Sequence, residues 1–207
     1  MTPRRRCVGA ILAGGAASRM HGAPKGLERV GGARLIDRVA AALAGAADDV
    51  VVVANAADAA SWLPGASVVR DRRTGLGALG GIHAALEAAA ADVLTVPWDT
   101  PFVPAGLLRA LREAGEAGDA DIVAPRSASP WGHEPLCAWF ARAALAPIEA
   151  ALDAGDRRAG ALAARAKLSV VDVSSWGDDA DIFFNVNSPA DLDRAVAIAA
   201  RLRAGAS

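Results

Sequence analysis

Residues 7–15 read CVGAILAGG, an unbroken run of small and apolar side chains followed by a loop with two glycines. A run of this length that is closed by glycine predicts a strand buried on both faces. Such strands are typical of parallel sheets covered by helices, in which ligands bind beyond the carboxyl ends of the strands. The loop after Leu12 is therefore the first place to look for a functional site.

The rest of the chain repeats this alternation of strand and helix patterns. Apolar or alternating runs predict further strands over residues 50–53, 66–69, 93–96, 122–124, 135–140 and 168–173. Helical spacing predicts helices over residues 35–46, 82–90, 105–114, 145–152 and 189–202. In the last of these, Ser188 is expected to be the N-cap and Pro189 to lie in the first turn. Repeated β-α units predict an α/β fold of three αβα layers, with a mostly parallel, doubly wound sheet of the Rossmann-like type.

Length and composition fit one compact domain over residues 1–207, with 53% hydrophobic residues available for its core. No stretch has the length and apolarity of a transmembrane helix. The formal net charge of −1 argues against a general nucleic-acid binder. We therefore expect a domain that binds neither membranes nor nucleic acids.

The cysteines and the N-terminal residues indicate the cellular compartment of the protein, and the cysteines and histidines bear on metal binding. Cys7 and Cys137 form no CxxC pair and are interpreted as small core residues in a reducing compartment. The histidines are scattered, so the sequence predicts no His/Cys metal cluster. The basic start and the apolar run after it resemble a signal peptide, but Gly14, Gly15 and Arg19 interrupt that run. We expect a cytoplasmic protein.

The first loop, residues 12–27, has the composition of a phosphate-binding loop. Gly14 and Gly15 lack side chains, so backbone N–H groups can approach a phosphate closely. Arg19 and Lys25 add positive charge for a polyanion. It is not a Walker A loop, because Gly-Lys-Ser/Thr is absent. The alternative interpretation is a flexible turn with two solvated cations.

A carboxylate follows another of the expected strands. Asp99 comes just after the strand at 93–96, so we expect it at the same carboxyl edge of the sheet. Its oxygens could hold Mg²⁺, which prefers one or two carboxylates together with phosphate oxygens. The alternative is an Asx turn or a helix cap before Pro101. The glycine-rich loop on a neighbouring strand end favours the metal site.

Three motifs together resemble those of a known family. Residues 12–15 read LAGG, with SRM at 18–20 and KGL at 25–27; residues 98–102 read WDTPF, and residues 183–189 read FFNVNSP. These motifs resemble the molybdenum cofactor guanylyltransferases and, more broadly, nucleotidyltransferases of the nucleotide-sugar pyrophosphorylase type. The resemblance covers about residues 8–195. The NVNSP segment resembles the corresponding segment of the molybdopterin-guanine branch. Family members that use GTP tend to have glycine at the position of Gly14.

This resemblance implies an enzyme that transfers GMP from GTP to the phosphate of molybdopterin or the molybdenum cofactor and releases pyrophosphate, with Mg²⁺ as cofactor. It implies that Arg19, Lys25 and Asp99 are catalytic and that Asp99 is the metal ligand. The nucleotide-binding residues it implies are Leu12, Ala13, Gly14, Gly15, Lys25, Asn55, Asp71 and Asp99. Candidates for acceptor binding are His133, Asn185 and Asn187. Besides the substrates, it implies partners among cofactor-biosynthesis proteins or molybdoenzyme chaperones.

Several of these residues also have a purely structural interpretation. Asp71 lies between arginines and could be a solvated turn residue. His133 could belong to a polar turn before a strand, and the two asparagines to a turn that leads into the capped helix. Asn185 and Asn187 alternate along an extended segment, so we expect their side chains to face one way. Four tryptophans are interpreted as core or rim packing, namely Trp62, Trp131, Trp139 and Trp176.

Residues 75–80 provide an alternative from another class of protein. They read GLGALG, with Gly75, Gly77 and Gly80 in the GxGxxG pattern of an NAD-binding oxidoreductase. Two observations weaken this interpretation. Five residues separate the pattern from the strand that ends near Val69, and the dinucleotide fingerprint normally follows the first strand.

Three residues depart from the family's pattern. Val53, Ala78 and Trp98 stand where the family more often has a polar residue, a proline and a small residue. These departures keep open a binding protein that has lost catalysis. Within the same chemistry, a cytidylyl or sugar-phosphate nucleotidyltransferase is the remaining alternative.

Overall fold

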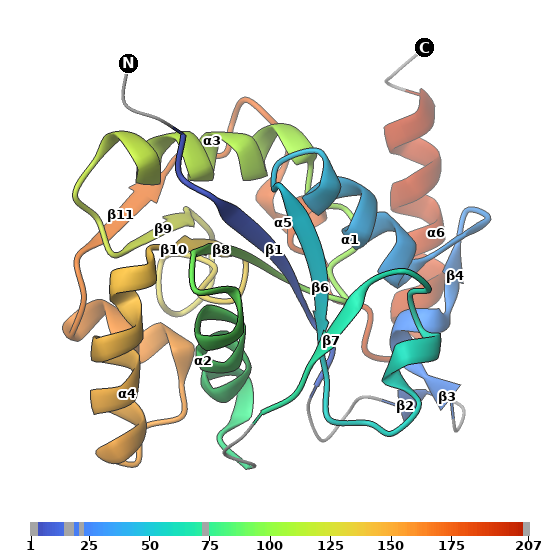
Figure 1. Ribbon diagram of the computed structural model, residues 1–207. Coiled ribbons are helices and arrows are strands. Elements are labelled where there is room, and N and C mark those ends of the chain that lie inside the picture. The colour runs from blue at the N-terminus through green and yellow to red at the C-terminus, as the bar shows by residue number, and fades with distance from the viewer. Residues whose placement is uncertain (1–3, 15–18, 21–22, 72–74, 205–207) are drawn as a thin grey trace.

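A seven-stranded sheet forms the centre of the protein (Figure 1). The structure, a computed structural model, describes residues 4–14, 19–20, 23–71 and 75–204. The strands lie in the order β11 (Leu168–Val171), β9 (Ile122–Pro125), β10 (Ala138–Phe140), β8 (Asp92–Pro97), β1 (Cys7–Leu12), β6 (Asp49–Val53) and β7 (Ser67–Val69). β10 pairs antiparallel with β8 and with β9, and the other neighbours are parallel. The predicted mostly parallel α/β sheet is confirmed.

Helices cover both faces of the sheet and give the three expected layers (Figure 1). α1 (Leu35–Ala44) and α3 (Ala105–Ala117) pack on one face, and α2 (Gly77–Ala89) and α4 (Leu145–Asp153) on the other. α6 (Pro189–Ala204) packs outside the first of these layers, against the hairpin of β4 (Arg29–Val30) and β5 (Ala33–Arg34). Among the described residues, no helix has both the length and the apolarity needed to span a membrane.

Apolar spacing explains how the helices sit on the sheet. In α1 the residues Leu35, Ile36, Val39 and Leu43 form one face, and each is at most 1% exposed. α2 is instead buried on nearly every side from Leu79 to Leu86, because it lies between the sheet and α4. The two cores on either side of the sheet fix the strand ends that carry the site.

The N-terminus of α6 forms the predicted cap. The backbone N–H of Asp191 donates to Ser188 Oγ, and Ser188 Oγ donates to Asp191 Oδ2. Asp191 Oδ2 also accepts from the backbone N–H of Asn187. This reciprocal cap satisfies N–H groups that would otherwise lack partners, and it holds the residues just before the helix in place.

The structure corrects the bounds of some elements. The helix expected from residue 82 begins at Gly77, because burial of α2 outweighs the low helix propensity of its glycines. β10 covers only the end of the run expected over 135–140 and is antiparallel, a direction that an apolar pattern does not encode. β11 ends at Val171 instead of residue 173.

β6 is less buried than its run of valines predicts. Val50 and Val51 are half-buried, whereas Val52 and Val53 are buried. Only the three-residue edge strand β7 lies beyond β6, so the start of β6 is poorly covered. Three short elements have no periodic pattern in the sequence and were not predicted: α5 (Asp179–Ile182) and the pair of β2 (Arg19–Met20) and β3 (Ala23–Pro24).

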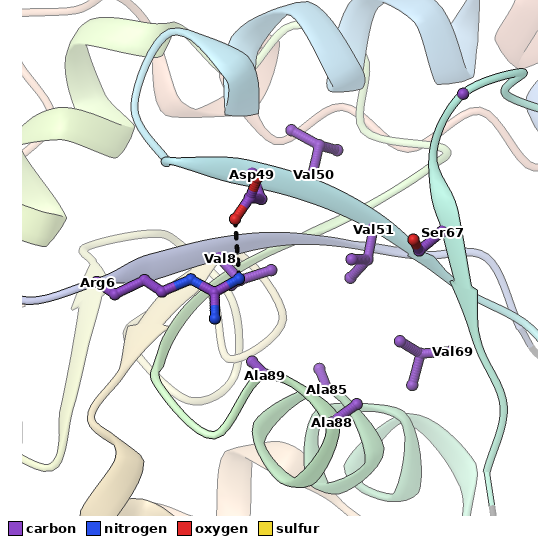
Figure 2. Close-up of a pocket in the computed structure, with 11 residues that line it drawn as sticks. Arg6, Val8, Asp49, Val50, Val51, Ser67, Val69, Ala85, Ala88 and Ala89 are labelled. Atoms are coloured by element: carbon purple, nitrogen blue, oxygen red, sulfur yellow. Dashed lines mark hydrogen bonds and ion pairs between the residues drawn. The ribbon is translucent and has the colours of Figure 1, made fainter.

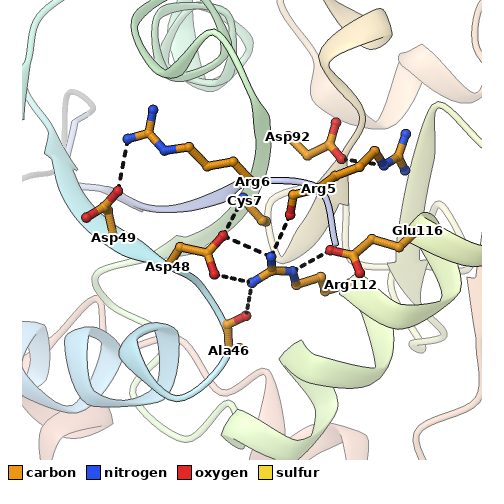
Figure 3. A network of polar contacts seen from close by, with 9 residues as sticks. All are labelled: Arg5, Arg6, Cys7, Ala46, Asp48, Asp49, Asp92, Arg112 and Glu116. Atoms are coloured by element: carbon orange, nitrogen blue, oxygen red, sulfur yellow. Dashed lines mark hydrogen bonds and ion pairs between the residues drawn. The ribbon is translucent and has the colours of Figure 1, made fainter. Parts of the chain in front are cut away.

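A buried arginine joins the amino-terminal ends of β1 and β6 to α3 (Figure 3). The side chain of Arg112 is 1% exposed, and its five N–H groups all find acceptors. The acceptors are the backbone carbonyls of Arg5 and Ala46, both carboxylate oxygens of Asp48, and Glu116 Oε1, at 2.7–3.0 Å. Hydrogen bonding from the Arg112 guanidinium lowers the pKa of the Asp48 carboxyl from its usual value. Asp48 also accepts from the backbone N–H of Cys7.

Both cysteines lie in the core, as predicted. Cys7 is 0% exposed and Cys137 is 2% exposed. Burial raises the pKa of the Cys7 thiol to about 12 and also raises the pKa of the Cys137 thiol. A thiol reacts through its thiolate, so both groups should be inert in the folded protein.

We expect Ellman's reagent at pH 8 to label Cys7 and Cys137 at least about 100-fold more slowly in the native protein than in guanidinium, because thiolate formation requires opening of the core. Absorbance of the released thionitrobenzoate measures both rates. Fast labelling of the native protein would contradict the burial of the two thiols.

Candidate active site

A cavity of about 570 Å³ lies at the carboxyl ends of β1, β6 and β8, the edge that the sequence indicates. The strand ends contribute Leu12, Ala13, Gly14, Val53, Ala54, Asn55, Ala56, Pro97, Trp98 and Asp99. The start of α2 contributes Gly77, Ala78 and Gly81. Trp62, Asp71, Gly75, Leu136 and Lys25 complete the lining. Loops far apart in the chain therefore meet around one cavity.

An ion pair lies in the wall of this cavity. Lys25 belongs to the short 3-10 turn η1 (Lys25–Leu27), and its Nζ lies 2.6 Å from Asp99 Oδ2. Both side chains are largely buried, with 8% of Lys25 and 13% of Asp99 exposed. The low exposure strengthens their attraction relative to a pair in water. Two of the three predicted catalytic side chains are thus in direct contact.

The segment before α6 lies beside this pair and is hydrogen-bonded to the residues around it. Asn187 Oδ1 accepts a second hydrogen bond from Lys25 Nζ, at 2.7 Å. The backbone N–H of Val186 donates to the carbonyl of Asp99, and Thr100 Oγ1 donates to Asn185 Oδ1. Asn185 therefore contacts Thr100, and Asn187 contacts Lys25, the partner of Asp99. Their acceptor-binding role stays a prediction.

Asn55 and Asp71 face each other at the ends of β6 and β7. Asn55 Nδ2 donates to Asp71 Oδ2 at 3.0 Å, and the backbone N–H of Asp71 donates to Asn55 Oδ1 at 2.9 Å. Both residues line the cavity. The pair brings an amide and a carboxylate to one wall, while Asp99 lies at the end of a different strand.

The remaining predicted residues have other surroundings. His133 is 5% exposed, its Nδ1 lies 2.9 Å from the carbonyl oxygen of Trp131, and it is not among the residues that line the cavity. Burial raises the pKa of the neighbouring Glu134 carboxyl. Gly15 and the side chain of Arg19 lie outside the described residues. The roles of His133, Gly15 and Arg19 stay predictions.

Residues 75–80 have a different place from that of a dinucleotide fingerprint. They follow β7, an edge strand, whereas β1 lies in the middle of the sheet. Gly77 and Gly80 already belong to α2, and Gly77 lines the cavity from the side of the helix. The helix N-terminus is a favourable place for an anion. The pattern therefore contributes to the same cavity as the first loop and forms no second nucleotide site among the described residues.

Two aromatic residues of the site were not predicted from the sequence. Trp62 and Trp98 line the cavity, and their ring centroids lie 4.9 Å apart. They are also nearly fully buried, so the expected packing role of Trp62 is confirmed as well. For Trp98 its position next to Asp99 was a usable indication; for Trp62 no motif existed.

A second recess of about 550 Å³ runs along the face of the sheet beside α2 (Figure 2). Alanines of α2 and valines of β1, β6 and β7 line most of it. Arg6 and Asp49 lie at one end, where they pair with each other at 2.9 Å, and Ser67 lies on the edge strand. This recess has no cluster of reactive side chains among the residues described, which favours the first cavity as the active site.

Comparison with known proteins identifies the family of this chain. A family described as "MobA-like NTP transferase domain" matches residues 9–170. The chain is 37% identical to a molybdenum cofactor guanylyltransferase of Burkholderia vietnamiensis, over 89% of this chain and 92% of that protein. It is 36% identical to one of Cereibacter sphaeroides, over 92% and 95%.

A solved structure has the same fold. Molybdopterin-guanine dinucleotide biosynthesis protein A from Archaeoglobus fulgidus superposes with a TM-score of 0.78 at 28% identity, covering 94% of this chain and 99% of that one. These similarities support nucleotidyl transfer and argue against an NAD-binding oxidoreductase. By sequence and by structure, this chain belongs to the molybdenum cofactor guanylyltransferases of the MobA-like NTP transferase family.

Proposed function

We propose that this protein transfers GMP from GTP to the phosphate of molybdopterin or the molybdenum cofactor and releases pyrophosphate. The observation that carries the proposal is the Lys25–Asp99 pair in the wall of the cavity at the carboxyl ends of β1 and β8. Membership of the guanylyltransferase family supports GTP and molybdopterin as substrates.

The reaction needs charge neutralisation more than it needs a base. The acceptor is a phosphate monoester, already ionised near neutral pH. One of its oxygens attacks the α-phosphorus of GTP, a new P–O–P bond forms, and the bond to the β-phosphate breaks. Both reactants are anions, so positioning and electrostatic stabilisation provide most of the catalysis.

The residues of the site fit a divalent ion that would be bound jointly by a protein carboxylate and by phosphates of the substrate. The described residues contain no group of three or more His, Cys, Asp or Glu side chains that could form a protein-only metal cage. Two carboxylates, Asp99 and Asp71, lie in the cavity wall, and Mg²⁺ is commonly bound by one or two carboxylates and substrate phosphates. We propose that Asp99 holds Mg²⁺, which when bound supplies positive charge to the phosphates.

Other residues of the chain would neutralise charge on the phosphates and hold the nucleotide. Lys25 would neutralise the triphosphate and the leaving pyrophosphate, and Asn187 would orient its ammonium group through their 2.7 Å hydrogen bond. Arg19 would add a second positive charge. The backbone of Leu12, Ala13, Gly14 and Gly15, with Asn55 and Asp71, would hold the nucleotide.

The first test measures pyrophosphate release from GTP, CTP and ATP, each with Mg²⁺ and molybdopterin. We expect acceptor-dependent release from GTP and little from the other two. Release from CTP would keep nucleotidyl transfer and overturn the choice of guanine. If folded protein released no pyrophosphate from any of the three, the proposed function would be wrong.

The variant Lys25→Ala should lower kcat by about 10²–10³, the usual loss when one charge at a developing anion is removed. The chain has one other lysine, Lys167, which pairs with Asp119 on the surface at 2.9 Å. Lys167→Ala is therefore a matched control, and steady-state kinetics should give it wild-type turnover. Equal turnover in both variants would remove Lys25 from the mechanism.

A further inference from the structure

Trp98 makes a second contact between the two segments that carry the ion pair. Trp98 precedes Asp99, and Gly26 follows Lys25. A Cβ atom on Gly26 would lie 2.2 Å from Cε3 of the Trp98 ring, so the indole occupies the space above this glycine. The ring is 1% exposed. The indole contact and the ion pair are thus adjacent links between η1 and the end of β8.

The indole is itself held in place. The backbone N–H of Trp98 donates to the carbonyl of Leu12, which extends the pairing of β8 with β1. Its ring packs against Trp62 with 33° between the ring planes. Trp62 is tethered in turn, because its Nε1 donates to Asp58 and its carbonyl accepts from Arg34. Trp98 is therefore a fixed surface against which the turn of Lys25 can rest.

The proposed roles of Lys25 and Asp99 require a contact other than the ion pair to keep Lys25 in position during turnover. If Lys25 binds phosphates and Asp99 binds a metal ion, each charge has another partner once substrate is present. The contact of Gly26 with the Trp98 ring involves no charge, so phosphates and a metal ion do not compete for it. It can hold η1 at the same distance from β8 whether the ion pair is closed or open.

We propose that Trp98 is a positioning residue for nucleotidyl transfer: its indole, seated on Gly26, holds the Lys25 turn at its working distance from Asp99. This inference rests on the function proposed above for Lys25 and Asp99. It gives a role to a tryptophan that the family pattern does not call for. Trp62 acts through Trp98, by fixing the orientation of its ring.

The chain offers a matched control for this contact. Gly115 of α3 lies under the Trp139 ring in the same way, and a Cβ atom on Gly115 would lie 2.4 Å from Cε3 of that ring. Trp139 is fully buried and is not among the residues that line the cavity. Gly115→Ala should therefore disturb packing as Gly26→Ala does, but away from the Lys25 turn.

The first experiment needs no substrate. An amine-acylating reagent, N-hydroxysuccinimide acetate, is applied in limiting amount, and peptide mass spectrometry gives the labelling of Lys25 relative to Lys167. In Trp98→Ala we expect this ratio to rise about 10-fold, because the turn opens more often. Trp98→Phe and Gly115→Ala should leave the ratio near its wild-type value. An unchanged ratio in folded Trp98→Ala would overturn the proposal, whatever the enzyme's activity.

The second experiment separates kcat from KM for GTP, with thermal unfolding to establish the folded fraction. Trp98→Ala and Gly26→Ala should lower kcat by about 10- to 100-fold with a much smaller change in KM, as expected for misplacement of a catalytic group. Trp98→Phe should recover most of the rate. Gly115→Ala should lower Tm and leave kcat unchanged. A comparable loss of kcat in Gly115→Ala would reduce the role of Trp98 to general packing.

The two experiments keep this inference apart from the proposed function. A wild-type enzyme that released no pyrophosphate would overturn the function, and the labelling ratio would still decide whether Trp98 holds the Lys25 turn. An active enzyme with an unchanged ratio in Trp98→Ala would retain the function and discard the positioning role.

Discussion

Asp99→Asn is expected to lower kcat for pyrophosphate release by about 10²–10³, while the protein stays folded. Asparagine has the shape of aspartate and can still accept the hydrogen bond from Lys25 Nζ, now at 2.6 Å from Asp99 Oδ2. It lacks the negative charge that a hard divalent ion requires. Raising the Mg²⁺ concentration should recover part of the lost rate if the variant binds the ion more weakly.

The control for this substitution is Asp119→Asn. Asp119 precedes β9, at the end of the sheet opposite to the cavity, and its side chain is 90% exposed. The two variants change the same functional group and the same charge. If Asp99→Asn turned over as fast as Asp119→Asn, Asp99 would have no role as a metal ligand.

Arg112→Met should reduce the free energy of unfolding by about 2–4 kcal/mol. Methionine keeps much of the apolar stem but leaves five acceptors without the guanidinium, among them two backbone carbonyls. The expected loss is below that for a fully buried pair, because the Asp48 side chain is 39% exposed and regains water. Urea denaturation followed by tryptophan fluorescence measures the change.

The matched control is Arg109→Met on the same helix. Arg109 is exposed and donates one hydrogen bond, to the carbonyl of Gly45 at 3.1 Å. Its replacement should change the unfolding free energy by less than about 0.5 kcal/mol, as for most surface substitutions. Equal losses in the two variants would show that the buried network contributes no more than one exposed hydrogen bond.

The Arg112 network also predicts how stability depends on pH. The pKa of Asp48 is lowered in the folded protein, from an ordinary value of 3.8. The folded state therefore binds the proton more weakly than the unfolded state does, and the stabilisation is complete above pH 3.8 and lost as the pH falls through the lower, folded pKa. Arg112→Met should show a smaller loss of stability over this acid range than the wild type.

Much of the fold follows from local sequence. Apolar runs closed by glycine or proline predict β1, β8 and β9, because a strand buried between two layers must be apolar on both faces. The spacing of Leu35, Ile36, Val39 and Leu43 predicts α1, and the side chains of Ser188 and Asp191 predict the start of α6. The start of α2 at Gly77 was missed, because packing overrides propensity there.

The sequence by itself therefore determined an α/β sheet with helices on both faces, and it placed a glycine-rich loop and Asp99 at the edge where ligands bind. Only the tertiary structure decided which side chains meet: Lys25 with Asn187, 162 positions away, and Gly26 with the ring of Trp98. The physical reason is that hydrophobic patterns record whether a segment is buried, and not which segment lies beside it. Strand order, and the direction of β10, depend on the packing of the whole chain.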